Sequence, residues 1–240
     1  MAGGGAAASA LSSPWRALIQ RALDANAHLR HSTYFQLATV GAGGRPANRT
    51  VVFRGFQEHC DKIQINTDAR SNKIVEIRNC PSGEVCFTEL AHLYQYSWEQ
   101  FRISGSIDVI DSSSADPTKL QHRENAWFTS SVKSRLQYLG PQPGIPVLDD
   151  EHTKDVHLDP SAGPVDAFCL LVLDPEKVRH TFFSPSLCWC CLTAIRLLNF
   201  WSSAMFTVDY LNLKSNQRLI FTRSLNGEGS NDWMAKTVCP

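Results

Sequence analysis

Short runs of β-type residues, separated by turn sequences, are the feature that most constrains the fold of this chain. Tyr34–Val40 ends at the turn Gly41–Gly44, which leads into a second run at Pro46–Phe53. Further runs of the same kind are Lys62–Asn66, Glu84–Leu90, Tyr94–Ile110, Phe168–Leu173 and Val208–Thr222, the last of which supplies two short strands. Many short strands with few helices indicate a closed or nearly closed β-barrel, because closure hides the sheet edges.

Three helices are expected beside these strands. Pro14–Leu29 carries apolar residues at helical spacing after Ser12 or Ser13, either of which can cap it. A second helix begins after Asp68 or Ser71 and runs to about Asn79, where Pro81 stops it. Asp116–Tyr138 reads as helical, and the Pro-, Asp- and Gly-rich stretch Gly140–Pro164 reads as a long loop. The predicted fold class is α+β, mainly β.

Composition excludes several classes of protein. The 23 Lys and Arg residues balance 23 Asp and Glu, so no broad basic field is available for nucleic acid. The eight cysteines include Cys188, Cys190 and Cys191, but none shows a zinc-ligand spacing. We therefore expect free thiols, no metal and a cytoplasmic protein. Residues 1–13 are rich in Ala, Gly and Ser and read as a disordered leader, with an organellar transit peptide as the alternative.

The stretch Arg49–Arg54 is a strand that carries two cations on opposite faces. Alternation places Arg49 with Val51 and Phe53, and Arg54 with Thr50 and Val52. Taken alone, it fits an edge strand with solvated arginines as well as a binding site.

The next informative stretch, Asn66–Lys73, runs from a strand end into a helix start. The free backbone N–H groups and the helix dipole at such a place attract a phosphate. Ser71 adds a hydroxyl, Lys73 a positive charge, and Arg49 from the neighbouring strand a planar pair of donors. An ordinary capped helix with a surface lysine is the alternative. Later in the chain, Gln100 can pair with both a donor and an acceptor, as a flavin ring presents, or can simply point outward.

Four motifs occur in order with fitting gaps: RTVVFR at 49–54, NTDARSNK at 66–73, NCP at 79–81 and QFRISG at 100–105. In the order and spacing of these four motifs, the chain resembles the pyridoxamine 5'-phosphate oxidase family. The resemblance continues loosely through Ala126-Trp127, Leu173–Val178, Val208–Leu211 and Arg218, and covers roughly Tyr34 to Pro240. It implies a Greek-key FMN-binding split β-barrel of about six strands with flanking helices. It also implies a homodimer, with FMN in a cleft at the dimer interface.

The resemblance also assigns roles to residues. Arg49, Ser71 and Lys73 are expected to hold the FMN phosphate, with Asn72 where the family often has Arg. The flavin would be lined by residues of the two strands, Thr50, Val51, Val52, Asn66 and Thr67, and its ring would meet Gln100. Arg54 is expected to bind the substrate's phosphate and Arg218 to cover the substrate. No catalytic residue is evident.

The implied activity is oxidation of pyridoxamine or pyridoxine 5'-phosphate to pyridoxal 5'-phosphate. Two departures from the family pattern bear on the substrate. His122, Arg123 and Glu124 stand where the family has a Tyr, Arg and Ser cluster, and Arg218 lacks the histidine that usually follows it. The alternatives are a flavin-binding barrel without turnover of B6 vitamers, and a flavin oxidoreductase with another substrate.

One segment, Arg179–Thr207, does not fit the family pattern. It holds three of the eight cysteines, two of the six tryptophans and no acidic residue. A membrane span would need about 20 uninterrupted apolar residues, and Pro185, Arg196 and Asn199 interrupt this run. We interpret the segment as an insertion from a retained intron or a mispredicted exon, within a single domain over residues 14–240.

Overall fold

The computed structural model describes residues 13–29, 31–88, 99–144, 157–182, 206–212, 217–223 and 233–238. Six strands form its centre: β1 (Tyr34–Val40), β2 (Pro46–Phe56), β3 (Ile63–Asp68), β4 (Ser82–Thr88), β5 (Glu99–Ile110) and β6 (Phe168–Phe182). Neighbouring strands pair in the order β4-β1-β2-β3-β6-β5, and β5 pairs again with β4. The six strands therefore close into a barrel with no free edge, as the strand pattern predicted.

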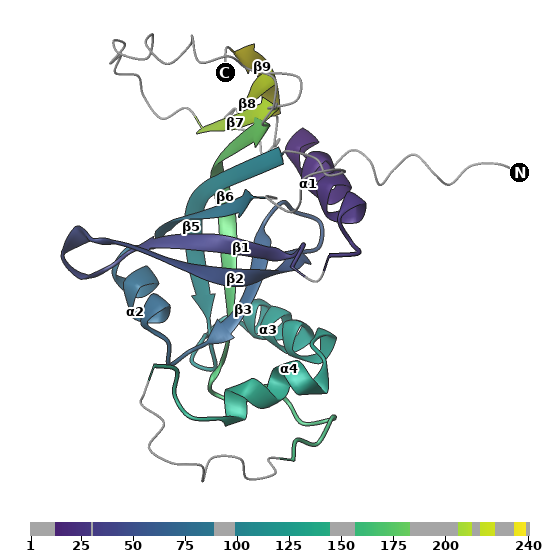
Figure 1. Ribbon diagram of the computed structural model, residues 1–240. Helices are drawn as coiled ribbons and strands as arrows, with labels where there is room; N and C mark the ends of the chain where they lie inside the picture. Colours follow the sequence, from purple (N-terminus) through teal and green to yellow (C-terminus); the bar gives the residue numbers. More distant parts are fainter. Residues whose placement is uncertain are drawn as a thin grey trace, which may run out of the picture.

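The barrel has a Greek-key topology. β1, β2 and β3 follow one another as antiparallel neighbours, and β4 then returns to pair with β1. This gives the spatial order 4-1-2-3 that defines the motif. Three further strands, β7 (Phe206–Asn212), β8 (Gln217–Arg223) and β9 (Trp233–Val238), extend the sheet beyond β5 and β6. β9 was not expected from the sequence. Figure 1 shows these strands at the end of the barrel opposite the helices α3 and α4.

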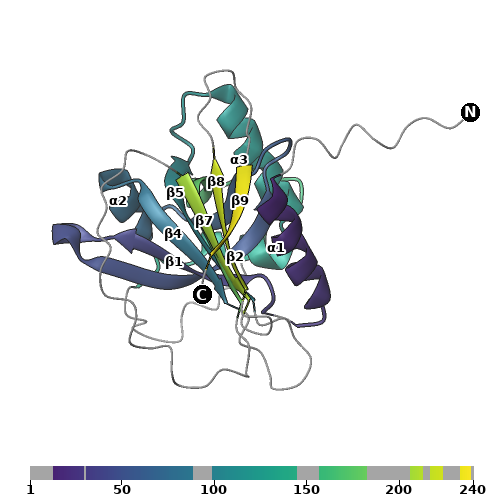
Figure 2. The same cartoon turned by 90° about the horizontal axis from the view of Figure 1, so that it is seen from above.

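Inward-facing apolar side chains of the strands fill the barrel, and two helices pack against it. Helix α1 (Pro14–Ala25) buries Trp15, Ile19, Ala22 and Leu23, and the Trp15 ring meets Phe56 edge to face. Helix α2 (Asn72–Asn79) buries Ile74 and Ile77 in the same core. Seen from above, α1 and α2 lie on opposite sides of the barrel (Figure 2).

Two helix predictions were wrong in extent. Helix α1 ends at Ala25 rather than Leu29, because the Asn26 side chain donates its amide hydrogen to the carbonyl of Ala22. The predicted helix over 116–138 is three pieces: α3 (Pro117–Thr129), α4 (Val132–Leu136) and the 3₁₀ turn η3 (Gln137–Leu139). The break falls at two serines: Ser130 Oγ donates to the carbonyl of Ala126, and Ser131 accepts from the backbone of Ser134 to start α4.

A bulge between β5 and β6 explains why a glycine stands at position 105 and why a proline is tolerated at position 175. The register shifts between Ser104 and Gly105, where Gly105 lies opposite Pro175. A Cβ atom on Gly105 would lie 2.0 Å from the carbonyl oxygen of Asp174, so no other residue fits without a backbone shift. Pro175 has no N–H to donate to the ladder, and a bulge is where a strand tolerates it.

Both ends of the segment 179–207, which the sequence predicts to be an insertion, lie in strands. Residues 179–182 belong to β6, where Arg179 and His180 pair with Arg102 and Phe101 of β5, and residues 206 and 207 begin β7. The CWCC stretch and the run considered as a membrane span lie within 183–205, outside the described residues. Among the described helices, none has the length and apolar character needed to cross a membrane.

Candidate functional site

The predicted phosphate residues meet where β3 runs into α2. Lys73 Nζ donates hydrogen bonds of 2.9 Å to Thr67 Oγ1, at the end of β3, and to Ser71 Oγ, the residue before α2. Ser71 and Thr67 are buried, and Ser71 Oγ donates in turn to the carbonyl of Asp68. The hydroxyls and the ammonium group therefore form one connected cluster. Asn72 is exposed at the first position of α2, beside it.

Arg49 reaches the same place from β2. The burial pattern of β2 confirms the predicted alternation, with Arg49 and Val51 facing inward and Thr50 and Arg54 exposed on the outer face. Burial is the main reason that the pKa of Lys73 lies below its ordinary value, and the positive charge of Arg49 is the next. Within the described residues no carboxylate forms an ion pair with Lys73. Arg49 is paired with Glu76 of α2, and the partly buried Lys73 beside this pair is a cation suited to binding an anion.

The other predicted flavin-lining residues divide between the two faces of the sheet. The side chain of Val51 is 7% exposed and belongs to the core, so only its backbone can face a ligand. Thr50 lies on the outer face, where Gln36 donates a 2.9 Å hydrogen bond to its hydroxyl, and Val52 is half-buried there. Gln100, half-buried on β5, lies opposite Thr88, with β4 and β1 between it and β2. The structure does not bring Gln100 to the phosphate cluster.

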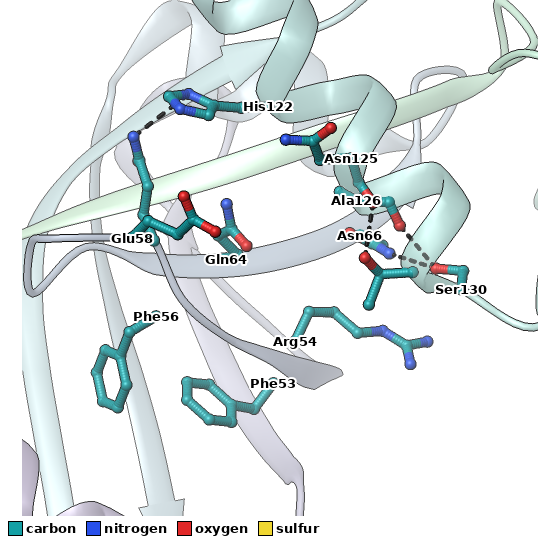
Figure 3. Close-up of a pocket in the computed structure, with 12 residues that line it drawn as sticks. Phe53, Arg54, Phe56, Glu58, Gln64, Asn66, His122, Asn125, Ala126 and Ser130 are labelled. Carbon is teal, nitrogen blue, oxygen red and sulfur yellow. Dashed lines mark hydrogen bonds between the residues drawn. The ribbon is translucent and has the colours of Figure 1, made fainter.

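A cavity of about 360 Å³ lies between the end of β2, β3 and α3. Its lining includes the predicted residues Arg54 and Asn66, together with Glu58, His122, Asn125 and Ser130. Figure 3 shows Arg54 on the side of the cavity where Asn66 Nδ2 donates a 3.0 Å hydrogen bond to Ser130 Oγ. Asn66 Oδ1 is buried and has no hydrogen-bond partner. The cavity thus combines one exposed guanidinium with an unused acceptor.

Sequence reasoning missed the part that α3 plays in this cavity. His122 and Asn125 enter it one turn apart on the helix, and His122 Nδ1 lies 3.3 Å from Gln57 Nε2. Its neighbour Arg123 turns the other way and is buried, donating to the carbonyls of Phe168 and Val165. Helical spacing after Pro117 could have predicted that His122 and Arg123 point in different directions. Which face of α3 meets the barrel depends on the tertiary structure.

Arg218 and Arg54 belong to strands at different ends of the barrel (Figure 1). Arg218 belongs to β8, paired with Leu211 of β7 and Val238 of β9. Figure 1 shows β8 at the end of the barrel opposite α3. Within one chain, the two residues predicted to bind substrate are not brought together.

Comparisons with known proteins identify the family of the chain. Residues 12–111 match the family model described as "Pyridoxamine 5'-phosphate oxidase, FMN-binding domain". A protein of Arabidopsis thaliana named pyridoxine/pyridoxamine 5'-phosphate oxidase 2 is 48% identical over 227 residues, covering 95% of this chain and 97% of its own. A crystal structure of a pyridoxamine 5'-phosphate oxidase-related, FMN-binding protein from Nostoc punctiforme is 31% identical, with a TM-score of 0.73, over 95% of this chain and 98% of that one.

A more distant structure shares the fold alone. PhzG from Burkholderia lata, solved in complex with tetrahydrophenazine-1-carboxylic acid, has a TM-score of 0.61 and 16% identity over 95% of this chain and 94% of its own.

Proposed function

We propose that this chain, which belongs to the pyridoxamine 5'-phosphate oxidase family, is an FMN-dependent oxidase that converts pyridoxamine or pyridoxine 5'-phosphate to pyridoxal 5'-phosphate. The observation that carries the proposal is the cluster of Arg49, Lys73, Ser71 and Thr67 at the start of α2. Two cations, the Thr67 hydroxyl and the N–H groups at the start of a helix provide the donors that a phosphate monoester requires.

The residues present fit FMN. Lys73 is partly desolvated, and among the described residues no carboxylate forms an ion pair with it. An anionic phosphate would supply the missing negative charge. Asn66 Oδ1 is a buried acceptor without a partner, on the strand that leads into the cluster. A ligand that presents a phosphate and an N–H group would satisfy both. We assign the phosphate to Arg49, Ser71, Lys73 and the N–H groups at the start of α2, near Asn72.

When bound, FMN would supply the redox chemistry by accepting a hydride from the C4' carbon of the vitamer and passing the two electrons to oxygen, which gives hydrogen peroxide. The alcohol of pyridoxine 5'-phosphate would also lose its O–H proton, and water would hydrolyse the imine formed from pyridoxamine 5'-phosphate with release of ammonia. The chain's own residues then bind and orient. Arg54 presents its guanidinium to the cavity of about 360 Å³, and Asn125 and Ser130 add hydrogen-bonding groups. Glu58 and His122 also line the cavity and are its side chains of a type that can accept a proton, and orientation of the vitamer can supply most of the rate.

We further infer that the working protein is a homodimer. Arg54 and Arg218 are both assigned to the substrate, yet β8 lies at the opposite end of the barrel from α3. A second copy arranged about a two-fold axis would bring its own Arg218 to the first copy's cavity. Size measurement in solution tests this, and a monomer that retains full activity would overturn it. Cys60, Cys80 and Cys169 carry free thiols, which supports a reducing compartment such as the cytoplasm.

The decisive experiment is an oxidase assay with FMN and each phosphorylated vitamer, following pyridoxal 5'-phosphate and hydrogen peroxide. Turnover of either vitamer supports the proposal. FMN binding without turnover would replace it with a flavin-binding barrel or an oxidoreductase for another substrate. The differences from the family pattern at 122–124 give a structural reason for this alternative. His122 enters the cavity, whereas Arg123 is buried and donates to backbone carbonyls, so it is not presented to a substrate.

A further inference from the structure

The guanidinium of Arg49 is held on one side by the barrel itself. Its NH1 nitrogen donates to the carbonyl oxygens of Leu37, at 3.3 Å, and Ala47, at 3.5 Å. The same nitrogen donates to the hydroxyl of Thr39 on β1. These acceptors lie on β1 and β2, so the barrel fixes the position of Arg49 without help from α2.

The other terminal nitrogen of Arg49 is occupied by a carboxylate. Glu76 Oε2 lies 2.5 Å from Arg49 NH2, and the same oxygen accepts a 2.5 Å hydrogen bond from Thr39 Oγ1. The two side chains of the ion pair are 21% and 17% exposed. Glu76 follows Lys73 by three residues on α2, so both project from the same face of the helix. Glu76 therefore sits on Arg49 beside the lysine of the phosphate cluster.

The groups around Glu76 favour the ionised form of its carboxylate. Burial works to raise the pKa of Glu76, but hydrogen bonds from Thr39 and Arg49 and the charges of Arg49 and Lys73 outweigh it and lower that pKa. Glu76 thus keeps its negative charge at neutral pH. A phosphate that approaches Arg49 and Lys73 meets this charge as well as the two cations.

We propose that Glu76 is an internal counter-ion that competes with the cofactor's phosphate for Arg49 NH2 and so sets the affinity of the protein for FMN. The inference rests on the proposed FMN site. Glu76 is not needed to position Arg49, because NH1 of Arg49 already donates to three acceptors of the barrel. Release of Arg49 NH2 from Glu76 frees a donor for a phosphate oxygen, and the lost ion pair offsets part of the binding energy.

The test compares flavin binding by the full-length apoprotein and by Glu76→Gln, which keeps the shape and the hydrogen-bonding oxygen but removes the charge. Binding is followed by quenching of flavin fluorescence, with FMN and with riboflavin, which has no phosphate. Glu76→Gln should bind FMN roughly threefold to tenfold more tightly. Riboflavin binding should not change. Glu76→Asp, whose carboxylate is drawn back from Arg49, should fall between the two.

Asp111→Asn is the matched control. Asp111 is also an ionised partner of an arginine on α2, Arg78, and its pKa is also lowered, with burial opposed by hydrogen bonds from Ser113. It does not belong to the phosphate cluster. Removing its charge should lower the unfolding temperature without changing the dissociation constant for FMN.

Thermal unfolding provides a second measurement. The Glu76→Gln apoprotein should unfold at a lower temperature than the wild type, whereas saturating FMN should raise its unfolding temperature by more. Weaker or unchanged FMN binding in Glu76→Gln, or a riboflavin effect equal to the FMN effect, would overturn the competition. Failure of the wild-type protein to bind FMN would instead overturn the proposed function on which the inference rests.

Discussion

Lys73 donates a 2.9 Å hydrogen bond to the hydroxyl of Thr67, and this contact joins the first turn of α2 to the last residues of β3. A strand end and a helix start, six residues apart in the chain, thereby present one cationic surface. Arg49, from β2, completes it. The charge of this surface has consequences both for the stability of the apoprotein and for cofactor binding.

Replacing Lys73 with Met should stabilise the apoprotein at neutral pH and weaken FMN binding. The pKa of Lys73 is lowered in the folded state, first by burial and then by Arg49, from its ordinary value of 10.5. Below the folded pKa the lysine is charged in both states, so folding bears the full desolvation cost. That cost disappears as the pH rises from the folded pKa towards 10.5. The stabilising effect of Lys73→Met should therefore shrink as the pH rises through the folded pKa towards 10.5, and thermal unfolding measured across pH will report this.

Arg49→Ala should weaken FMN binding at least about tenfold, because a charge-assisted hydrogen bond contributes roughly 1.5–3 kcal/mol. Glu76 and Thr39 lose a partner at the same time, so the variant's unfolding temperature needs to be measured alongside the flavin titration. Unchanged FMN affinity in a folded variant would remove Arg49 from the phosphate site.

Arg54→Ala should raise the KM for the phosphorylated vitamer about tenfold or more while leaving bound flavin largely intact. Arg54 is exposed at the cavity between β2 and α3, on the opposite face of its strand from Arg49. Steady-state kinetics on the flavin-loaded protein test this, with flavin content measured by absorbance. Joint loss of flavin and substrate binding would mean that Arg54 belongs to the flavin site or supports the fold.

Gly105→Ala should destabilise the barrel by about 2 kcal/mol or more, because its Cβ would lie 2.0 Å from the carbonyl oxygen of Asp174. Gly163→Ala is a suitable control, since a Cβ there meets nothing within 4 Å. Chemical denaturation of the two variants gives the comparison. Equal stability of the two would show that the bulge between β5 and β6 adapts freely.

Replacing residues 183–205 with a short Gly-Ser linker should preserve flavin binding and improve soluble expression. These limits keep Arg179 and His180, which pair with Ile220 and Leu219 of β8, and keep all of β7. A variant that lacks the whole predicted insertion, residues 179–207, would lose those pairs and should bind FMN less well. Loss of folding in the shorter deletion would make the segment integral to the protein.

The sequence by itself determined the succession of strands up to β8 and the barrel class, and it predicts the local phosphate site. These depend on short-range patterns: alternation along β2, and the serine and lysine at the start of α2. Residues close in the chain share geometry that periodicity and helix-end chemistry fix, so the meeting of Ser71 and Lys73 could be predicted before any fold was known.

Only the tertiary structure decided which residues meet from different elements. Glu76 reaches Arg49 because α2 packs beside the strand pair β1–β2, and His122 enters the cavity because α3 presents one face to β2 and β3. The buried side chain of Val51, the separation of Arg218 from Arg54 and the addition of β9 follow from closure of the barrel and from strand pairing. Such contacts depend on packing between segments distant in sequence, which local propensity does not encode.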